Sequence, residues 1–218
     1  MLLKSYFHYL FLFCTAFGFT QKKISLNGEW EIIFDHHNEG AQALWYENDV
    51  FQNLKDKRKI KVPSSWELIE QDYEGVAFYR YAFEVPKDWE GKIIRLQFDA
   101  VNYLSEIWLN DEVVGFHEGG FTPFEFRVDN MIQAGKENIL TLRVVGPIIL
   151  SDKNIDGVTA LETPQWRGGL SGGIWQDVKL VSSGGTYVKD VFIEPNIKDK
   201  TATFHITMDH TEIKGDSA

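Results

Sequence analysis

The chain has 218 residues, a formal net charge of −10 and a hydrophobic share of 44%, a composition typical of a globular fold. An acidic chain with scattered Lys and Arg lacks the basic footprint of proteins that bind phosphate backbones, which excludes nucleic acid as a partner. Neutral sugars stay compatible with this charge, because their recognition needs hydrogen bonds and apolar faces more than net charge.

Residues 1–20 have the features of a signal peptide. One lysine precedes the apolar run LFLFCTAFGF, which is too short to span a membrane, and Ala16 and Gly18 are small residues at the cleavage spacing. The sequence therefore predicts export to the periplasm or the extracellular space, and nothing later resembles a transmembrane segment. A lipoprotein anchor at Cys14 is the less favoured alternative, because bulky residues precede this single cysteine.

From residue 21 to residue 183, apolar and polar residues alternate with a period of two. This pattern predicts half-buried antiparallel strands, and Asn110 and Asp111 suit a tight hairpin turn because both tolerate positive φ. Many short strands broken by Gly, Pro and Asn favour an all-β sandwich. The alternating apolar residues are Leu26, Trp30, Ile32 and Phe34, then Tyr79, Tyr81, Phe83 and Val85, then Ile94, Leu96 and Phe98, then Phe124, Phe126 and Val128, then Leu140, Leu142 and Val144, and then Ile174, Val178 and Leu180.

Two segments are less regular. Residues 36–58 are polar with interspersed aromatic residues, and within them residues 40–54 give a weak helical pattern. Residues 146–173 are rich in Gly and Pro and contain Trp166 and Arg167. Loops of this length in a compact domain are usually functional or mobile.

After residues 182–185, the strand pattern restarts. Two further alternating runs follow, TYVKDVFIEPNI and TATFHITMDHTEI, before the sequence ends at Ala218. Two strands do not make a stable sheet alone, so we predict a second β-domain that begins near Thr186 and is incomplete. The predicted organisation is a signal peptide at 1–20, a sandwich domain at 21–183 and an incomplete domain at 186–218.

Candidate catalytic residues are sparse. Sugar hydrolysis needs two carboxylates across the scissile bond, and Glu118 and Glu125 are the most suggestive pair. Solvated or loop-bracing carboxylates are the favoured interpretation of both. The Gly-rich stretches EGGFTPFEF and WRGGLSGGIW lack the features of a phosphate cradle, so their glycines are expected to allow positive φ and close packing.

No metal site or cofactor is predicted. His205, Thr207 and Asp209 would share one strand face, but an exposed face is the simpler interpretation. A structural calcium ion held by loop carbonyls stays open, because such sites leave little trace in a sequence.

Several linked motifs resemble the sugar-binding domain of family 2 glycoside hydrolases, which include β-galactosidases, β-glucuronidases and β-mannosidases. The resemblance spans Ser25 to Val181, with Gln176 where the family has arginine. It implies a jelly-roll (galactose-binding-like) sandwich, then an immunoglobulin-like sandwich from near Thr186, then a (β/α)8 barrel with the catalytic glutamates. We assign no catalytic residue and expect the fragment alone to be inactive. The motifs are PSSWE, YEGVAFYRYAFEVP, the run from WEGKIIRLQF through HEGGFTPFEFRV, AGKENILTLRV and GGIWQDVKLV.

The resemblance also implies two loops that contact the terminal sugar at the mouth of the barrel. The first precedes the Tyr-Arg strand and holds Tyr73 and Glu74. The second precedes Gly173, where the family has an aspartate six residues earlier and this chain has Arg167 beside Trp166. A cation there would favour an acidic substrate group or turn away as a salt-bridge partner. Loop packing and domain–domain contact are the alternative roles of Arg167 and Trp166.

The leading functional hypothesis is a carbohydrate-binding module of an exported, retaining, exo-acting glycosidase, with substrate at the interface with a downstream catalytic domain. A stand-alone carbohydrate-binding or adhesion module is the alternative, because similar sandwiches bind glycans without catalysis. A third interpretation is a spacer or dimer contact, and homo-oligomer formation stays open.

Overall fold

The computed structural model describes residues 21–160 and 171–210, and in them the predicted all-β sandwich is confirmed. The predicted signal peptide and Cys14 lie outside this range. No helix among the described residues combines the length and the apolar character needed to cross a membrane. Every named strand pair is antiparallel.

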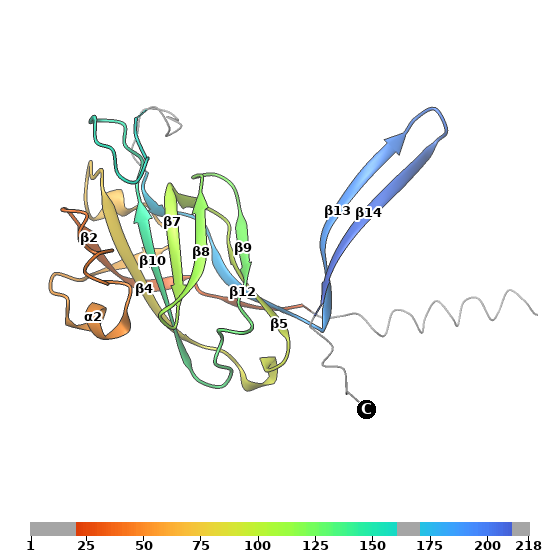
Figure 1. Ribbon diagram of the computed structural model, residues 1–218, viewed down its shortest axis with the longest axis horizontal. Helices are drawn as coiled ribbons and strands as arrows, with labels where there is room; N and C mark the ends of the chain where they lie inside the picture. Colours follow the sequence, from red (N-terminus) through yellow and green to blue (C-terminus); the bar gives the residue numbers. More distant parts are fainter. Residues whose placement is uncertain (1–20, 161–170, 211–218) are drawn as a thin grey trace, which may run out of the picture.

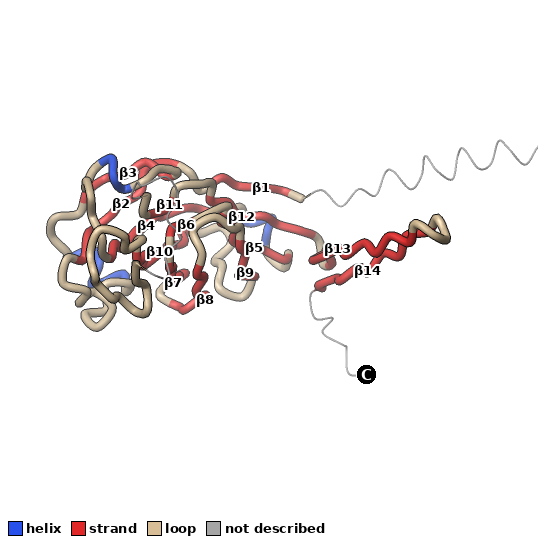
Figure 2. The backbone as a smooth tube through the Cα atoms, turned by 90° about the horizontal axis from the view of Figure 1, so that it is seen from above, coloured by secondary structure: helices blue, strands red, loops and turns tan. Residues whose placement is uncertain are grey.

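Two sheets form the sandwich (Figures 1 and 2). The larger has six strands in the order β3 (Arg58–Val62), β2 (Gly28–Asp35), β4 (Val76–Glu84), β10 (Glu137–Val145), β7 (Leu104–Leu109) and β8 (Glu112–Glu118). The smaller has four strands in the order β1 (Lys22–Ser25), β12 (Val178–Ser183), β5 (Ile93–Phe98) and β9 (Phe124–Arg127). A short pair, β6 (Val101–Asn102) with β11 (Gly173–Ile174), lies at one end.

The main core lies between the two sheets and includes the residues that the alternating pattern placed on one face, together with others such as Trp66, Trp89 and Ile107. Trp30 of β2 is fully buried and stacks on Tyr81 with ring centroids 4.9 Å apart. Its indole N–H donates to the carbonyl of Leu26 at 2.9 Å, which satisfies its only polar group. Each such aliphatic or aromatic side chain stabilises the fold by about 1.5–3 kcal/mol relative to exposure.

A second, smaller core covers the outer face of β4 and β10. Residues 36–58 fold over this face and carry the helix α2 (Asn48–Asn53), which inserts the fully buried Phe51. The first five residues of β4 are therefore buried on both faces, whereas the alternating pattern predicts a half-buried strand. Ala77 and Phe78 are consecutive apolar residues, and each belongs to a different core.

The remaining local predictions agree with the structure. Asn110 and Asp111 connect β7 to β8 with φ values of 53° and 67°, as the tight hairpin turn requires. Two short 3-10 helices, η2 (Trp66–Leu68) and η3 (Lys87–Trp89), lie in the connections on either side of β4.

The restarted pattern forms a long hairpin of β13 (Thr186–Asn196) and β14 (Thr201–His210), which projects away from the sandwich (Figure 1). It contacts the sandwich at its base, where Arg95 lies over the ring of Tyr187 at 4.2 Å. Beyond the base its apolar side chains are exposed, among them Phe192 and Phe204. The boundary of a second domain at Thr186 stays a prediction.

Candidate functional site

The loop that carries Tyr73 and Glu74 lies at one end of the sandwich, the upper end in Figure 1. Three segments gather there: residues 63–75 ahead of β4, residues 146–160 after β10, and residues 171–175, which contain β11. We call this region the loop end.

Trp66, in segment 63–75, connects that segment to the other two. Its side chain is fully buried, and a Cβ on either Gly146 or Gly172 would lie 2.2 Å from the indole. Only glycine permits so close an approach of the backbone. The backbone N–H of Trp66 also donates to the carbonyl of Gly172 at 3.0 Å, and that of Ser64 donates to Ile174 at 3.0 Å. The indole of Trp66 therefore fixes the relative positions of all three segments.

Glu67, next in the chain, closes its own loop. One carboxylate oxygen accepts from the indole N–H of Trp66 at 3.0 Å, and the other accepts from the backbone N–H of Asp72 at 2.9 Å. Burial raises the pKa of this carboxyl above its usual value, although the two hydrogen bonds oppose the shift.

Glu74 binds the adjoining loop. Its carboxylate accepts hydrogen bonds from the backbone N–H groups of Ile149 and Leu150 and from the hydroxyl of Ser151, the last at 2.5 Å. Burial by itself raises the pKa of Glu74, but these hydrogen bonds and the nearby charge of Lys153 outweigh it and lower the pKa. The side chain is only 5% exposed, so it braces the loop in this structure.

Tyr73 is likewise held by its own surroundings. Its hydroxyl donates to the carbonyl of Val76 at 2.8 Å, and its ring packs edge-on against Phe34 at 4.9 Å and Trp66 at 5.7 Å. Burial raises the pKa of the phenol well above its usual range. The predicted substrate contacts of Tyr73 and Glu74 stay predictions, since Tyr73 is engaged within its own loop and Glu74 with the adjoining one.

Asn102 supports the other side of the loop end. Its amide donates to the carbonyl of Ser171 at 2.7 Å, and Gly120 packs so closely against it that a Cβ would lie 2.1 Å from its oxygen. The indole N–H of Trp175 donates to the carbonyl of Gly120 at 2.8 Å. The close packing predicted for the two Gly-rich stretches is thus confirmed at Gly120 of the first and at Gly172 of the second.

Trp166 and Arg167 lie outside the described residues. Ser171 follows the segment that carries them, and its bond to Asn102 ties that side of the segment to the loop end. The role of the pair stays a prediction.

The two carboxylates singled out for catalysis have structural partners. Glu118 accepts from the hydroxyl of Tyr103 at 3.1 Å, and Glu125 forms an ion pair with Arg95 at 3.0 Å. These contacts agree with the bracing interpretation. Within residues 21–160 and 171–210, no three His, Cys, Asp or Glu side chains are grouped as a metal ion would require.

Sequence reasoning did not identify the roles of Trp66 and Asn102. Trp66 lies in the PSSWE motif, which signalled the family, but its partners Gly146 and Gly172 are far away in the chain. Asn102 lies in β6 between Val101 and Tyr103, where a polar residue fits the alternating pattern, so no local signal distinguished it.

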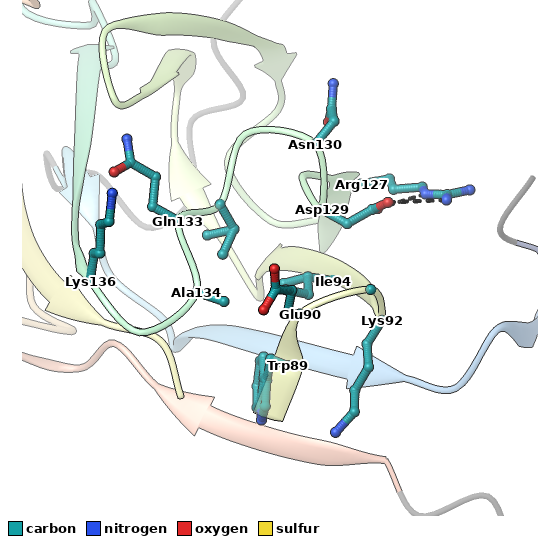
Figure 3. Close-up of a pocket in the computed structure, with 12 residues that line it drawn as sticks. Trp89, Glu90, Lys92, Ile94, Arg127, Asp129, Asn130, Gln133, Ala134 and Lys136 are labelled. Carbon is teal, nitrogen blue, oxygen red and sulfur yellow. Dashed lines mark hydrogen bonds and ion pairs between the residues drawn. The ribbon is translucent and has the colours of Figure 1, made fainter. Parts of the chain in front are cut away.

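A large hollow lies at the opposite end of the sandwich, with a volume of about 1250 Å³ (Figure 3). The turn around Glu90 and the segment 127–136 form its walls. Its polar side chains do not converge: Lys92 and Asn130 point away from each other, and Arg127 is held by Asp129 at 2.7 Å. It therefore lacks the focused set of polar groups that a ligand site needs.

Comparison with known proteins identifies one family. Residues 23–184 match the family model described as "Glycosyl hydrolases family 2, sugar binding domain". A β-galactosidase of Thermoanaerobacter pseudethanolicus is 30% identical over 184 residues, which cover 84% of this chain and 22% of the relative. A β-glucuronidase of Bacteroides fragilis is 27% identical over 145 residues, which cover 64% of this chain and 19% of the relative.

Solved structures have the same fold. A β-glucuronidase from an uncultured Clostridium species matches with a TM-score of 0.69 and 28% identity, over 88% of this chain and 34% of that one. A β-glucuronidase from Ruminococcus gnavus, solved with D-glucuronic acid, matches with a TM-score of 0.70 and 22% identity, over 86% of this chain and 34% of that one. The chain thus spans between a fifth and a third of the length of the relatives described here.

Proposed function

Because the chain belongs to family 2 of the glycosyl hydrolases through that family's sugar-binding domain, we propose that it is the sugar-recognition part of an exported β-glycosidase. The observation that carries the proposal is the family match over residues 23–184, which include both sheets of the sandwich. Its relatives are β-galactosidases and β-glucuronidases, so the proposed reaction is hydrolysis of a β-linked terminal sugar.

We propose that bond cleavage takes place in a (β/α)8 barrel encoded downstream, by a double displacement between two glutamates. The sandwich would contribute one wall of the entrance to that active site, through the loop end and the neighbouring Trp166 and Arg167. The contacts of Trp66, Glu74 and Asn102 support this proposal, because they hold three loops in one arrangement before any sugar arrives. Such preorganisation is what positioning a substrate requires.

On this proposal, Glu74 and Tyr73 position the loop and keep their predicted place beside the sugar. Hydrogen bonds from Ile149, Leu150 and Ser151 already occupy much of the Glu74 carboxylate, so its main part is to hold the loop. Arg167, where the family has a carboxylate, would then prefer a substrate with an acidic group, such as a glucuronide.

The test compares the 218-residue chain with the longer product of its gene, each assayed with nitrophenyl β-galactoside and nitrophenyl β-glucuronide. We expect hydrolysis by the longer product and none by the chain alone. Hydrolysis by the 218-residue chain alone would contradict the proposal that bond cleavage takes place in a downstream barrel. A longer product that binds glycans but cleaves neither substrate would favour the stand-alone binding module instead.

Export is proposed from residues 1–20, whose sequence has the features of a signal peptide. Fractionation of cells that express the tagged protein is the direct measurement. Recovery from the periplasm or the medium, with residues 1–20 removed, is expected. Retention of an intact N-terminus in the cytoplasm would contradict the proposal.

A further inference from the structure

A second hollow, distinct from the loop end, lies between β2 and the 36–58 segment. Its volume is about 590 Å³, within the size range of small-ligand sites. We call it the flank pocket. Its lining includes Phe34, His36, Trp45, Lys55, Lys57 and Arg58.

The flank pocket is positively charged although the chain as a whole is acidic. Residues 55–61, KDKRKIK, contain five of the chain's cationic residues and one carboxylate. Arg58 is neutralised by Glu70 at 2.5 Å. Lys57 is held by the carbonyls of Phe51 and Gln52 at 3.2 and 2.8 Å, which fix its ammonium without cancelling its charge.

Lys55 is exposed and has no hydrogen-bond or ion-pair partner among the described residues. Asp56 is the only carboxylate that lines the pocket. The pocket is therefore lined by two lysines and one carboxylate, apart from the paired Arg58. The other lining groups that can form hydrogen bonds are mainly donors.

Trp45 gives the pocket a fixed aromatic wall. It is partly exposed, its ring lies 5.6 Å from that of Phe78, and Gly40 packs against it with no room for a Cβ. Its indole N–H makes no hydrogen bond within residues 21–160 and 171–210. His36 adds a second ring, which contacts Tyr73 at 5.2 Å and so borders the loop end.

We propose that the flank pocket binds an anionic sugar, through a carboxylate or a sulfate ester on the ring. The ammonium groups of Lys55 and Lys57 would supply the charge, and Trp45 would pack against the apolar face of the sugar. A pocket rich in donors and poor in acceptors favours such a ligand over a neutral one, because its own donors would otherwise be left unpaired. This site would be separate from the terminal-sugar site and does not depend on the proposed hydrolysis.

The simplest alternative is that these lysines only protect an edge of the sheet. β3 is an edge strand, and charged side chains on edge strands prevent pairing with other chains. Lys59 and Lys61 fit that role, since they lie on the strand opposite Glu31 and Glu29. Lys55 and Lys57 precede the strand and line the pocket, so edge protection does not account for them.

The test uses the ¹⁵N-labelled 218-residue chain, titrated with glucuronic acid, with glucose 6-sulfate and with glucose. The Trp45→Phe variant assigns the indole N–H signal of Trp45. We expect that signal to move and saturate with the two anionic sugars and not with glucose. Binding to one anion alone would still support the pocket, and would identify the carboxylate or the sulfate as its ligand.

Two charge-matched variants provide the control. Lys55→Gln should weaken the binding of the anionic sugars about three- to tenfold, between the values for exposed and desolvated charged hydrogen bonds. Lys59→Gln removes the same charge from the neighbouring edge strand and should change binding less than about twofold. Equal weakening by both variants would reveal diffuse attraction and overturn the proposal, as would equally tight binding of glucose or an unchanged Trp45 signal.

Discussion

Arg127, on the outer strand of the smaller sheet, donates to the carboxylate of Asp209 at 3.2 Å, and this contact joins the sandwich to the β13–β14 hairpin. The same guanidinium donates to the carbonyl of His210 at 3.0 Å. Next to it, Tyr187 lies beneath Arg95 and is 8% exposed. Two arginines of the sandwich thus hold both strands of the hairpin at its base.

We predict that Arg127→Gln loosens the hairpin with little effect on the sandwich. A partly exposed ion pair contributes less than about 1 kcal/mol, so the free energy of unfolding should hardly change. The double variant Arg127→Gln/Tyr187→Ala should release the hairpin from the sandwich. NMR relaxation would then show larger nanosecond motions of the backbone amides of β13 and β14. Lys136→Gln is the control, and equal mobility in all variants would contradict the role of these contacts.

Glu74→Gln should destabilise the chain by about 2 kcal/mol, because a carboxylate that accepts from backbone N–H groups is replaced by an amide with its own donor. Denaturant unfolding measures the difference. Glu90→Gln is the matched control, since the carboxylate of Glu90 has no hydrogen-bond or ion-pair partner within the described part of the chain. A similar loss in both variants would argue against the bracing role of Glu74.

The same contact predicts a pH dependence. The pKa of Glu74 is lowered in the folded chain from its usual 4.5, so the unfolded chain takes up its proton first as the pH falls. The stability that Glu74 contributes is therefore complete above pH 4.5 and is lost as the pH falls through the folded pKa. The difference in free energy of unfolding between wild type and Glu74→Gln should shrink in that acidic range. A constant difference down to the acid-unfolding limit would contradict this prediction.

Gly172→Ala should cost about 1–3 kcal/mol, because its Cβ would overlap the indole of Trp66. The cost should largely disappear in a Trp66→Leu background, where the overlapping ring atoms are absent. A double-mutant cycle of unfolding free energies measures this coupling. If Gly172→Ala costs the same in both backgrounds, another contact is responsible.

For the proposed enzyme, Arg167→Gln in the longer gene product should lower kcat/KM for the β-glucuronide by about tenfold or more, the scale of a lost charged hydrogen bond. The effect on the β-galactoside should be smaller. Lys92→Gln, at the opposite end of the sandwich, removes the same charge and should change neither. Equal losses on the two substrates would assign Arg167 to loop packing.

Local sequence patterns predicted the strands and the Asn110–Asp111 turn, because alternation and positive φ depend on neighbouring residues alone. The burial of β4 on both faces, with Phe78 in the second core, could not be predicted in that way, since it requires the 36–58 segment to fold over β4. The role of Glu74 was equally hidden. Its partner Ser151 is 77 residues away, and a carboxylate that braces a loop has the same local sequence as one that contacts a sugar.

The segment between residues 160 and 171 is flanked by two fixed points: Val158 is buried in the second core, and Ser171 is bound to Asn102. Every described strand of the two sheets lies outside the stretch between these points. Related proteins can therefore be expected to diverge most in length and composition there, while Trp66, Gly146 and Gly172 remain together. Substrate preference could then change over evolutionary time without loss of the scaffold.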